Sequence, residues 1–588
     1  MKKYEVVVGI DFGSSGSGFA YSYFDKNKII HGEIYGASVD HKVPTEIILD
    51  DQNYTIQFGA ECVNFLKSKG LKVGHYFKGI KMHLYENKNT IISNNSGKEL
   101  PLKLVIQKVL EEIKKIAIKE ISKNRPHLEK ETEKIKWVVT VPAIWNEHQK
   151  GVMMESCIGA GLVNDNTDKS LFFALEPEAA SLYCSINKEI DRQYFIKGEY
   201  YIVCDLGGGT GDIVAHLVGN NNNLNEISPS CGGNFGSNEI DKSIFKDVIL
   251  KLFGCKDFNT FYLKFNKKHK KKEGDDDGMD KAALFNDWCE FEREIKDFKE
   301  GATINKIENN ETFPINCSLF QDIFDDDVNI KEFVNEYNDT VNDSTLTLSV
   351  RNVSRRWIIE FPYGLIFSYM ETQANSICEI INKINSNGQI KYLIFVGGYC
   401  SNEILVNLIK NRLKHIKIFL QPSNPSLAVM EGAVLFGIEP STINIRKAKY
   451  TIGERLSIKW NDKLHSGRGT KFYDEDVKAW FCADCFVKYI EINKSLQFGE
   501  TITRESYYNK KAQNIPMEFY ITKKKDPSFI FEEGVKKVGE YRLDMGEQYK
   551  NLEDRKIITT MKFGGTFIDV AAKHLKSGKS VKTKLNFD

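Results

Sequence analysis

Two segments far apart in the chain share one pattern of apolar and polar positions. Residues 200–218 read YYIVCDLGGGTGDIVAHLV, so an apolar run reaches Asp205, three glycines interrupt it, and a second apolar run follows. Residues 6–24, VVVGIDFGSSGSGFAYSYF, repeat this layout with Asp11 before a loop of glycines and serines. Apolar runs joined by turn residues predict a strand–turn–strand hairpin in each segment. Two such hairpins predict duplicated lobes that face each other across a cleft.

Two further segments show a strand followed by a helix. Residues 137–143, WVVTVPA, predict a buried strand that stops at Pro142, with a helix from about Asn146, which can cap it. Residues 171–184, LFFALEPEAASLYC, predict a strand and then a helix with Pro177 in its first turn.

The same order recurs near residue 400. Residues 392–413 predict a strand, a Gly-Gly turn at 397–398 and a helix that Ser401 or Asn402 can cap. A last helix is predicted at 427–438, LAVMEGAVLFGI, where small residues share a face that permits close packing.

Length and charge narrow the class of protein. A chain of 588 residues is too long for one core, so we expect two to four domains. Its net charge of +1 provides no global field for nucleic acid or an anionic membrane. No run approaches the roughly 18 apolar residues that a membrane helix needs, and MKKYEVVVGIDFG lacks the apolar core of a cleavable signal. We therefore expect a cytoplasmic protein with no membrane span and no nucleic-acid ligand.

The twelve cysteines are scattered along the chain, which indicates buried thiols in a reducing compartment. Cys482 and Cys485 form one C-x-x-C, but no second pair and no His-x-His cluster accompanies it. Two buried thiols are therefore the plain interpretation, and a zinc site is the less favoured alternative.

The glycine loops suit a metal–polyphosphate ligand. Residues 207–209 carry no Cβ, so backbone N–H groups can approach an anion closely. Thr210 adds a hydroxyl, and Asp205 and Asp212 add carboxylates, which often hold Mg²⁺ through water beside phosphate oxygens. For one copy, a tight hairpin with Asp as a turn residue explains the pattern equally well. The second copy favours the ligand.

Glu176 is a candidate for chemistry at the predicted strand end. The carboxyl ends of strands are where α/β sheets bind ligands, so its carboxylate can orient a water or hold metal-bound water. The alternative is a carboxylate at a helix start, favoured there by the helix dipole.

Six segments occur in a fixed order: IDFGSSGSGFAY, VTVPAIWNE, LEPEAASLY, CDLGGGTGDI, FVGGYCSNEI and the helix at 427–438. In this order they resemble the heat-shock protein 70 family, and VPAIW, ALEPEAAS-x-Y and EGAVLFG resemble its atypical member-12 branch. The resemblance covers essentially the whole chain. It implies an α/β, two-lobed actin-like ATPase fold, with duplicated β-sheet cores around a nucleotide cleft and a small, mostly-β C-terminal domain.

The resemblance also implies a site for ATP or ADP with Mg²⁺. Asp11 and Asp205 would hold the metal through water, and Glu176 would position the attacking water. Lys81, rather than Lys78, would stabilise charge on the transferred phosphoryl group, although a solvated helix lysine is the alternative. The implied catalytic set is Lys81, Glu176, Asp205 and Thr210. The implied phosphate cradle is Gly13, Ser14, Ser15, Gly16, Gly207, Gly208, Gly209 and Thr210.

The implied adenosine site departs from the family pattern. The family helix carries Glu-Arg-x-Lys-Arg, whereas FEREIKDFKE has Ile295 at the first lysine position. After the Gly-Gly turn the family has Ser and Arg, whereas Tyr399 begins this segment and could pack there instead. The expected nucleotide contacts in this region are Gly236, Glu292, Lys296, Gly397, Gly398 and Tyr399.

The expected organisation has three parts. They are lobe I at 1–195 with an outer subdomain at 39–114, lobe II at 196–440 with an outer subdomain at about 232–320, and a β-rich domain at 441–588. Lobe II also contains a charged run at 267–278, expected to be a solvated loop, and an Asn- and Asp-rich insertion at about 302–350.

Alternating segments at 516–522, 528–533 and 556–564 predict that the last part is all-β. We see no acidic-leucine linker and no long helical lid. The C-terminal domain is therefore expected to resemble a lidless substrate-binding sandwich.

The resemblance favours an ATP-binding, chaperone-like protein, a weak Mg-dependent ATPase if active. Its nucleotide state would control the C-terminal module, and protein partners or clients are expected. The altered adenosine helix and missing lid favour an alternative, a nucleotide-gated scaffold or receptor with little or no ATP hydrolysis. A sugar or metabolite kinase is a third possibility, for which we see no sugar-site carboxylate motif.

Overall fold

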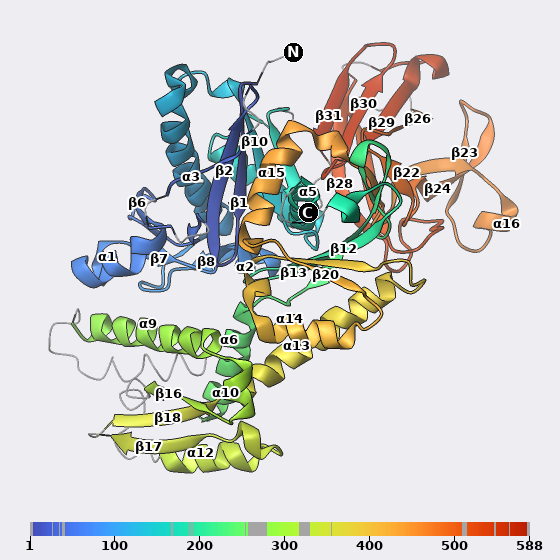
Figure 1. The fold of residues 1–588 in the computed structure, drawn as a ribbon. Coiled ribbons are helices and arrows are strands. Elements are labelled where there is room, and N and C mark those ends of the chain that lie inside the picture. The colour runs from blue at the N-terminus through green and yellow to red at the C-terminus, as the bar shows by residue number, and fades with distance from the viewer. Residues whose placement is uncertain are drawn as a thin grey trace.

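The computed structural model is a mixed α/β protein with several β-sheets, consistent with an actin-like ATPase fold (Figure 1). It describes residues 4–584 except 26–27, 35, 38–40, 166–167, 187–189, 191, 253–254, 257–278, 317–329, 354–355, 509–513, 546–547 and 564. The charged run at 267–278 and part of the expected 302–350 insertion lie outside the described residues. Within the described part of the chain, no helix combines the length and apolar character that crossing a membrane requires.

The first central sheet has the strand order β11-β10-β1-β2-β3, and β4 also pairs with β2. Its central strand β1 runs parallel to β10 and antiparallel to β2. Every residue of β1 and β10 is buried, which explains their continuous apolar sequence. The strands are β1 (Val6–Phe12), β2 (Gly16–Tyr23), β3 (Ile30–His31), β4 (Val43–Pro44), β10 (Ile135–Val141) and β11 (Leu171–Leu175).

The second central sheet repeats this plan as β20-β19-β12-β13-β14, with the same pattern of parallel and antiparallel neighbours. The two hairpins seen in the sequence are β1–β2 and β12–β13, so each lies at the same place in its sheet. The strands are β12 (Tyr200–Leu206), β13 (Gly211–Val218), β14 (Leu224–Glu226), β15 (Cys231–Gly233), β19 (Tyr392–Val396) and β20 (Ile418–Leu420).

Two helices, α5 (Glu176–Ile186) and α15 (Ala428–Ile438), pack against each other beside β1 and β12 (Figure 1). A Cβ built at Gly432 would lie 1.8 Å from the carbonyl oxygen of Ala179, so only glycine permits this approach. The small residues of 427–438 therefore serve close packing between two helices and β1.

The remaining helices and strands before residue 440 surround the two central sheets. Near the first sheet lie β5 (Ile47–Leu49), β6 (Thr55–Phe58), α1 (Cys62–Lys69), β7 (His75–Phe77), α2 (Ile80–Tyr85), β8 (Thr90–Ile92), β9 (Glu99–Pro101), α3 (Leu102–Asn124) and α4 (Glu147–Gly159). After β15 come α6 (Asn238–Ile244), α7 (Leu250–Leu252), α9 (Met279–Glu300), α10 (Ile304–Glu308), β16 (Thr312–Asn316), α12 (Ile330–Asp339), β17 (Ser349–Val353), β18 (Arg356–Pro362), α13 (Gly364–Ile384) and α14 (Glu403–Arg412). As expected, Asn146 caps α4 and Asn402 caps α14.

The last part of the chain is mostly β and is coloured orange to red in Figure 1. One sheet has the order β23-β24-β22-β27-β28 and another β26-β29-β30-β31. Two further strands, β21 and β25, extend the second central sheet from β14. The elements are β21 (Ile443–Lys447), β22 (Thr451–Lys459), α16 (Asp462–His465), β23 (Lys471–Asp474), β24 (Ala479–Ile490), β25 (Ser495–Gln497), β26 (Thr501–Tyr507), β27 (Asn514–Thr522), β28 (Lys536–Asp544), β29 (Lys556–Lys562), β30 (Asp569–His574) and β31 (Ser580–Lys584).

One of the three expected C-terminal strands is wrong. Residues 528–533 form a turn, with a single β-bridge at Phe529. The Glu532 carboxylate accepts hydrogen bonds from the backbone N–H groups of Ser528 (2.8 Å) and Phe529 (3.1 Å). When a side chain accepts hydrogen bonds from the backbone N–H groups of its own segment, those groups no longer need a neighbouring strand as a partner.

Candidate functional site

The two glycine-rich loops lie directly against each other. A Cβ built at Gly208 would lie 1.9 Å from the Ser15 hydroxyl oxygen. One built at Gly209 would lie 2.3 Å from the Ser14 hydroxyl oxygen. The turn between β1 and β2 is equally tight, since a Cβ at Gly13 would lie 2.1 Å from the Gly16 carbonyl oxygen. The glycines therefore allow a close meeting of two loops that come from different sheets.

The segment leading into α6 supports the 207–210 loop. The backbone N–H of Asn238 donates to the Gly208 carbonyl at 2.8 Å, and its side-chain amide donates to Ser15 at 3.2 Å. A Cβ at Gly236 would lie 2.3 Å from the Gly208 carbonyl oxygen, so Gly236 also belongs to this contact. The Thr210 carbonyl accepts from the N–H of Gly207 at 3.0 Å, which closes the loop.

Asp11, at the end of β1, is buried and bonded to one lysine and one hydroxyl. Its carboxylate lies 2.7 Å from Lys42 Nζ and accepts from the Thr140 hydroxyl at 3.1 Å. Burial alone would raise the pKa of Asp11, but the charges of Lys42 and Lys81 outweigh burial and lower it. Asp11 is therefore an ionised carboxylate.

Asp205 and Asp212 face each other as register partners across β12 and β13. Burial raises the pKa of Asp205 well above its ordinary value, and the carboxylates of Glu176, Asp212 and Asp11 raise it further. Burial also raises the pKa of Asp212, to about 6, although Lys81 and Lys449 oppose this shift. The backbone N–H of Ile144 donates to Asp212 at 3.1 Å.

Lys81 and Glu176 form a buried ion pair. Lys81 Nζ lies 2.5 Å from Glu176 Oε1, and both residues are less than a tenth exposed. Burial raises the pKa of Glu176 to about 7; Lys81 opposes the shift, and Asp11 and Asp212 add to it. The two groups predicted to act on a phosphoryl group and on a water therefore come together from α2 and from the start of α5.

These side chains form one carboxylate cluster, defined as Asp11, Glu176, Asp205 and Asp212. The amines that act on its members electrostatically are Lys42, Lys81 and Lys449. The negative charge of Asp205 is the least compensated in the cluster, since Lys42 is the only group among its main electrostatic neighbours that lowers its pKa. A divalent cation held through water would suit this excess of buried acid.

The predicted adenosine residues are only partly brought together. Gly397 has a φ of 86°, and a Cβ there would lie 2.5 Å from Asp205 Oδ1, so the Gly-Gly turn borders the carboxylate cluster. The buried Tyr399 hydroxyl donates to Gln373 Oε1 at 2.8 Å, and Gln373 Nε2 donates to the Gly236 carbonyl at 3.2 Å. Tyr399 is thus connected to Gly236 through Gln373.

The two residues on α9 behave differently. Glu292 forms an ion pair with Lys78, which joins α9 to the segment between β7 and α2. Lys296 is 63% exposed at its side chain and lies 3.7 Å from Glu300, one turn along the same helix. A nucleotide contact by Lys296 would require its side chain to leave this position.

Sequence reasoning missed two lysines whose charges act on the cluster. Lys42 lies before β4, and its Nζ also donates to the Ser426 carbonyl at 2.8 Å. Lys449 lies between β21 and β22, and its Nζ donates to the Ala143 carbonyl. Neither lysine stands in a recognisable motif, so no sequence signal could have identified them.

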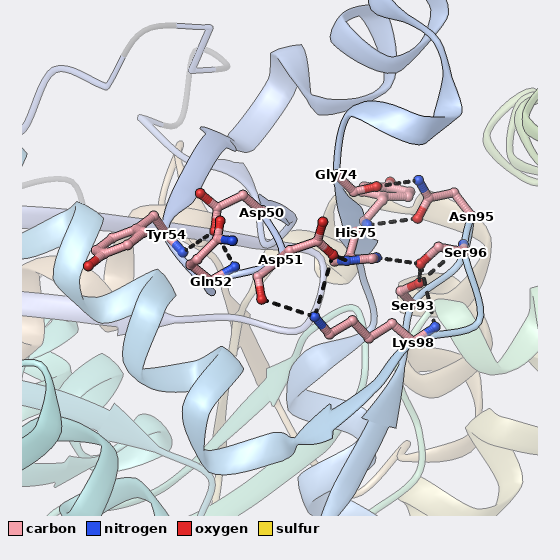
Figure 2. Close-up of polar contacts among 11 residues, drawn as sticks. Asp50, Asp51, Gln52, Tyr54, Gly74, His75, Ser93, Asn95, Ser96 and Lys98 are labelled. Atoms are coloured by element: carbon pink, nitrogen blue, oxygen red, sulfur yellow. Dashed lines mark hydrogen bonds and ion pairs between the residues drawn. The ribbon is translucent and has the colours of Figure 1, made fainter.

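Figure 2 shows a second polar network, between β7 and two neighbouring turns. His75 Nε2 lies 2.9 Å from Asp51 Oδ1, and His75 Nδ1 lies 2.7 Å from the Ser96 hydroxyl. A serine, a histidine and an aspartate are linked in the order of a hydrolytic triad, but with the two ring nitrogens exchanged, since the triad bonds its serine through Nε2 and its aspartate through Nδ1. However, the Asp51 side chain is 80% exposed, and the Ser96 hydroxyl is shared with Ser93. We interpret the network as a structural connection between the 50–54 turn and the β8–β9 hairpin.

A cavity of about 510 Å³ lies away from the carboxylate cluster, where β11 meets the C-terminal strands. Phenylalanines from both sides line it, among them Phe173 and Phe567, whose ring centroids are 5.1 Å apart. The C-terminal β part therefore contacts the first central sheet here and the second through β21.

Comparison with known proteins agrees with the motif resemblance. No protein-family model matches the chain. It is 26% identical over 655 residues to heat shock 70 kDa protein 12A of Mus musculus, covering 99% of this chain and 91% of that protein. It is 24% identical over 662 residues to human heat shock 70 kDa protein 12B, with the same coverage. The chaperone protein HscA homolog of Rickettsia bellii is 28% identical over 310 residues, 51% of this chain and 47% of that protein.

Proposed function

We propose that this chain, which aligns over 99% of its residues with proteins of the member-12 branch of the heat-shock protein 70 family, is an ATP-binding, chaperone-like protein. The nucleotide would lie in a two-lobed cleft, with the first central sheet in one lobe and the second in the other. Its state would control the β-rich C-terminal part, whose ligands would be proteins, as the names of the chaperone relatives suggest.

One observation carries the proposal. Two hairpins from two equivalent sheets bring their glycine loops face to face, and a cluster of buried carboxylates lies at the same place. Backbone N–H groups at such loops suit phosphate oxygens, and glycines permit the close approach. Few other ligands combine several negative oxygens with a bound divalent cation.

The carboxylate cluster fits Mg²⁺. Burial and three neighbouring acids raise the pKa of Asp205, which means that they disfavour its ionised form. A cation beside Asp205 would stabilise that ionised form. Asp11 and Asp205 would hold the ion through water. When bound, Mg²⁺ would neutralise phosphate charge and orient the phosphate oxygens.

The residues of the chain would then divide the work. Glu176 would accept a hydrogen bond from a water and orient it, because its carboxylate lies at the start of α5 beside the loops. Lys81 would place its positive charge beside the transferred phosphoryl group. Thr210 would contribute to the phosphate cradle from the 207–210 loop.

A second function, a nucleotide-gated scaffold or receptor with little hydrolysis, has an observation in its favour. Lys81 and Glu176 are paired with each other at 2.5 Å, so each already uses part of its charge and hydrogen-bonding capacity within the protein. The exposed side chain of Lys296 also lies beside Glu300 of its own helix. Tight ATP binding with single-turnover hydrolysis near the uncatalysed rate would establish this function instead.

Coupling to the C-terminal part would run through residues 443–450. Here β21 pairs with β14 and with β25, and Lys449 contributes to the electrostatics of Asp212. A ligand in the cleft can shift the C-terminal part only if the two nucleotide states hold this segment differently. We place the boundary between cleft and C-terminal module near residue 440.

The test measures ATP and ADP affinity by calorimetry and single-turnover hydrolysis with Mg²⁺. Asp205→Asn should weaken nucleotide binding at least tenfold, while Glu176→Ala and Lys81→Ala should slow hydrolysis about 100-fold or more with smaller effects on binding. Lys103→Ala is the control, since this lysine is 52% exposed on α3 and pairs with Glu155. Full binding and turnover in all three variants would refute the assignment.

A further inference from the structure

The structure brings a histidine to the C-x-x-C pair at the base of a C-terminal hairpin. One ligand atom from each of His465, Cys482 and Cys485 lies within 4.8 Å of the others, and all three residues are buried. His465 ends the short helix α16, whereas both cysteines lie on β24. In the sequence this pair had no recognisable partner, so the fold supplies the third group.

The backbone at this place is shaped to bring the two sulfurs together. Residues three apart on a regular strand point to opposite faces. Here β24 contains a bulge. Leu456 pairs with Cys485 and Ile458 pairs with Cys482, so a spacing of three residues on β24 lies opposite a spacing of two residues on β22. Asp484, within the bulge, has a φ of 59°, which is costly for a residue other than glycine. The extra residue places both sulfurs on one side of the strand.

Apolar side chains surround the three groups. Phe529, Trp460 and Val487 pack around the two cysteines. Gly469 closes over Cys482, because a Cβ there would lie 2.3 Å from the Cys482 sulfur.

We propose that His465, Cys482 and Cys485 bind one Zn²⁺ ion. Two thiolates and one imidazole are the soft and borderline ligands that Zn²⁺ takes, and they would fill three of its four tetrahedral positions, with water in the fourth. Asp484 does not supply the fourth ligand, since its carboxylate lies 2.7 Å from Arg455. Zn²⁺ with two thiolates and a neutral imidazole carries no net charge, which suits an apolar shell.

The ion would join two segments, and a third segment is bonded to one of them beside the site. His465 belongs to α16, the cysteines belong to β24, and the 528–530 segment is bonded to β24 through Phe486 N–H to the Ser528 carbonyl (2.9 Å). The β23–β24 hairpin next to this site carries exposed aromatic residues, Phe472, Tyr473 and Trp480. In Figure 1 this hairpin and α16 lie at the outer edge of the C-terminal part. Metal binding would therefore stabilise an aromatic surface that projects from the module.

The experiment titrates the full chain, reduced and metal-free under anaerobic conditions, with Co²⁺ as a spectroscopic probe. We expect one equivalent to produce thiolate-to-cobalt charge-transfer absorption, and Zn²⁺ to abolish it by displacement. Cys482→Ser and Cys485→Ser should lose the absorption, and His465→Gln should weaken binding at least ~10-fold. Cys231→Ser, a half-buried cysteine on β15, is the matched control and should retain it.

A second measurement covers the case in which a variant fails to fold. Limited proteolysis of the unaltered chain should cut within 461–480 more slowly with Zn²⁺ than with a chelator present. Absence of a one-to-one cobalt signal in the folded chain overturns the proposal. So does a Cys482–Cys485 disulfide in protein purified anaerobically, or a cobalt signal that survives both serine substitutions.

Discussion

Arg446 and Glu178 form a buried ion pair with two hydrogen bonds between α5 and the strand that leads to the C-terminal sheets. Arg446 Nε lies 2.7 Å from Glu178 Oε1, and Nη2 lies 2.6 Å from Oε2. Glu178 is fully buried and lies two residues after Glu176 on α5, while Arg446 is on β21. The pair therefore connects the helix that begins at the carboxylate cluster with the connection to the C-terminal module.

Breaking this pair should cost stability. Arg446→Met leaves the Glu178 carboxylate buried without its cation, so we expect unfolding free energy to fall by about 3–5 kcal/mol. The double variant Arg446→Met/Glu178→Met should recover much of the loss, because no uncompensated charge remains. Urea unfolding of the full chain measures both. Lys103→Met breaks an ion pair whose side chains are both 52% exposed and should cost less than about 1 kcal/mol.

Glu176 should make hydrolysis depend on pH near neutrality. Its pKa is raised to about 7 by burial, so below pH 6 it is mostly a protonated acid, which is a weaker hydrogen-bond acceptor and cannot take a proton from water. Single-turnover rates should rise between pH 6 and pH 8 with a midpoint near 7. The rise should be absent in Glu176→Gln, and an unchanged profile in that variant would contradict the assigned role.

The same shift has the opposite effect on stability. A carboxyl whose pKa is higher in the folded state takes up a proton on folding between its ordinary value of 4.5 and about 7. Its contribution to stability is therefore present at pH 4.5 and is lost as the pH rises through 7. The melting temperature of the unaltered chain should fall relative to Glu176→Gln between pH 5 and pH 8.

Lys78 and Glu292 should control nucleotide release. This ion pair joins the β7–α2 segment to α9, two regions that face each other in Figure 1. Lys78→Glu should accelerate ADP release about 3- to 10-fold, corresponding to a coupling of about 1 kcal/mol. Stopped-flow release of a fluorescent ADP measures this rate. Lys78→Glu/Glu292→Lys should restore slow release, while Lys103→Glu, which alters an exposed ion pair between α3 and α4, should not accelerate it.

The two glycines at 397–398 should respond very differently to alanine. Gly397 has a φ of 86°, and a Cβ there would lie 2.4 Å from the Leu206 carbonyl oxygen. Gly397→Ala should therefore destabilise the chain by about 2 kcal/mol or more and weaken nucleotide binding. At Gly398 a Cβ meets nothing within 4 Å, so Gly398→Ala is the matched control. Equal melting temperatures for the two variants would contradict this reasoning.

Local patterns were sufficient for the central elements. The hairpins β1–β2 and β12–β13, the strand before α5 and the Asn402 cap all follow from runs of apolar residues and from turn chemistry within a few positions. The failure at 528–533 has the same origin, since alternation alone did not reveal that Glu532 would bond its own backbone. The motif order was also sufficient to identify the family resemblance.

The sequence by itself thus determined which segments carry the chemistry, because hydrophobic period, glycine loops and acidic strand ends are properties of neighbouring residues. Tertiary structure decided which side chains meet. Lys81 reaches Glu176 across 95 positions, and Arg446 reaches Glu178 across 268. His465 meets the two cysteines only because a bulge turns both sulfurs to one side. Such meetings depend on how sheets stack and where a strand gains a residue, which no local pattern specifies.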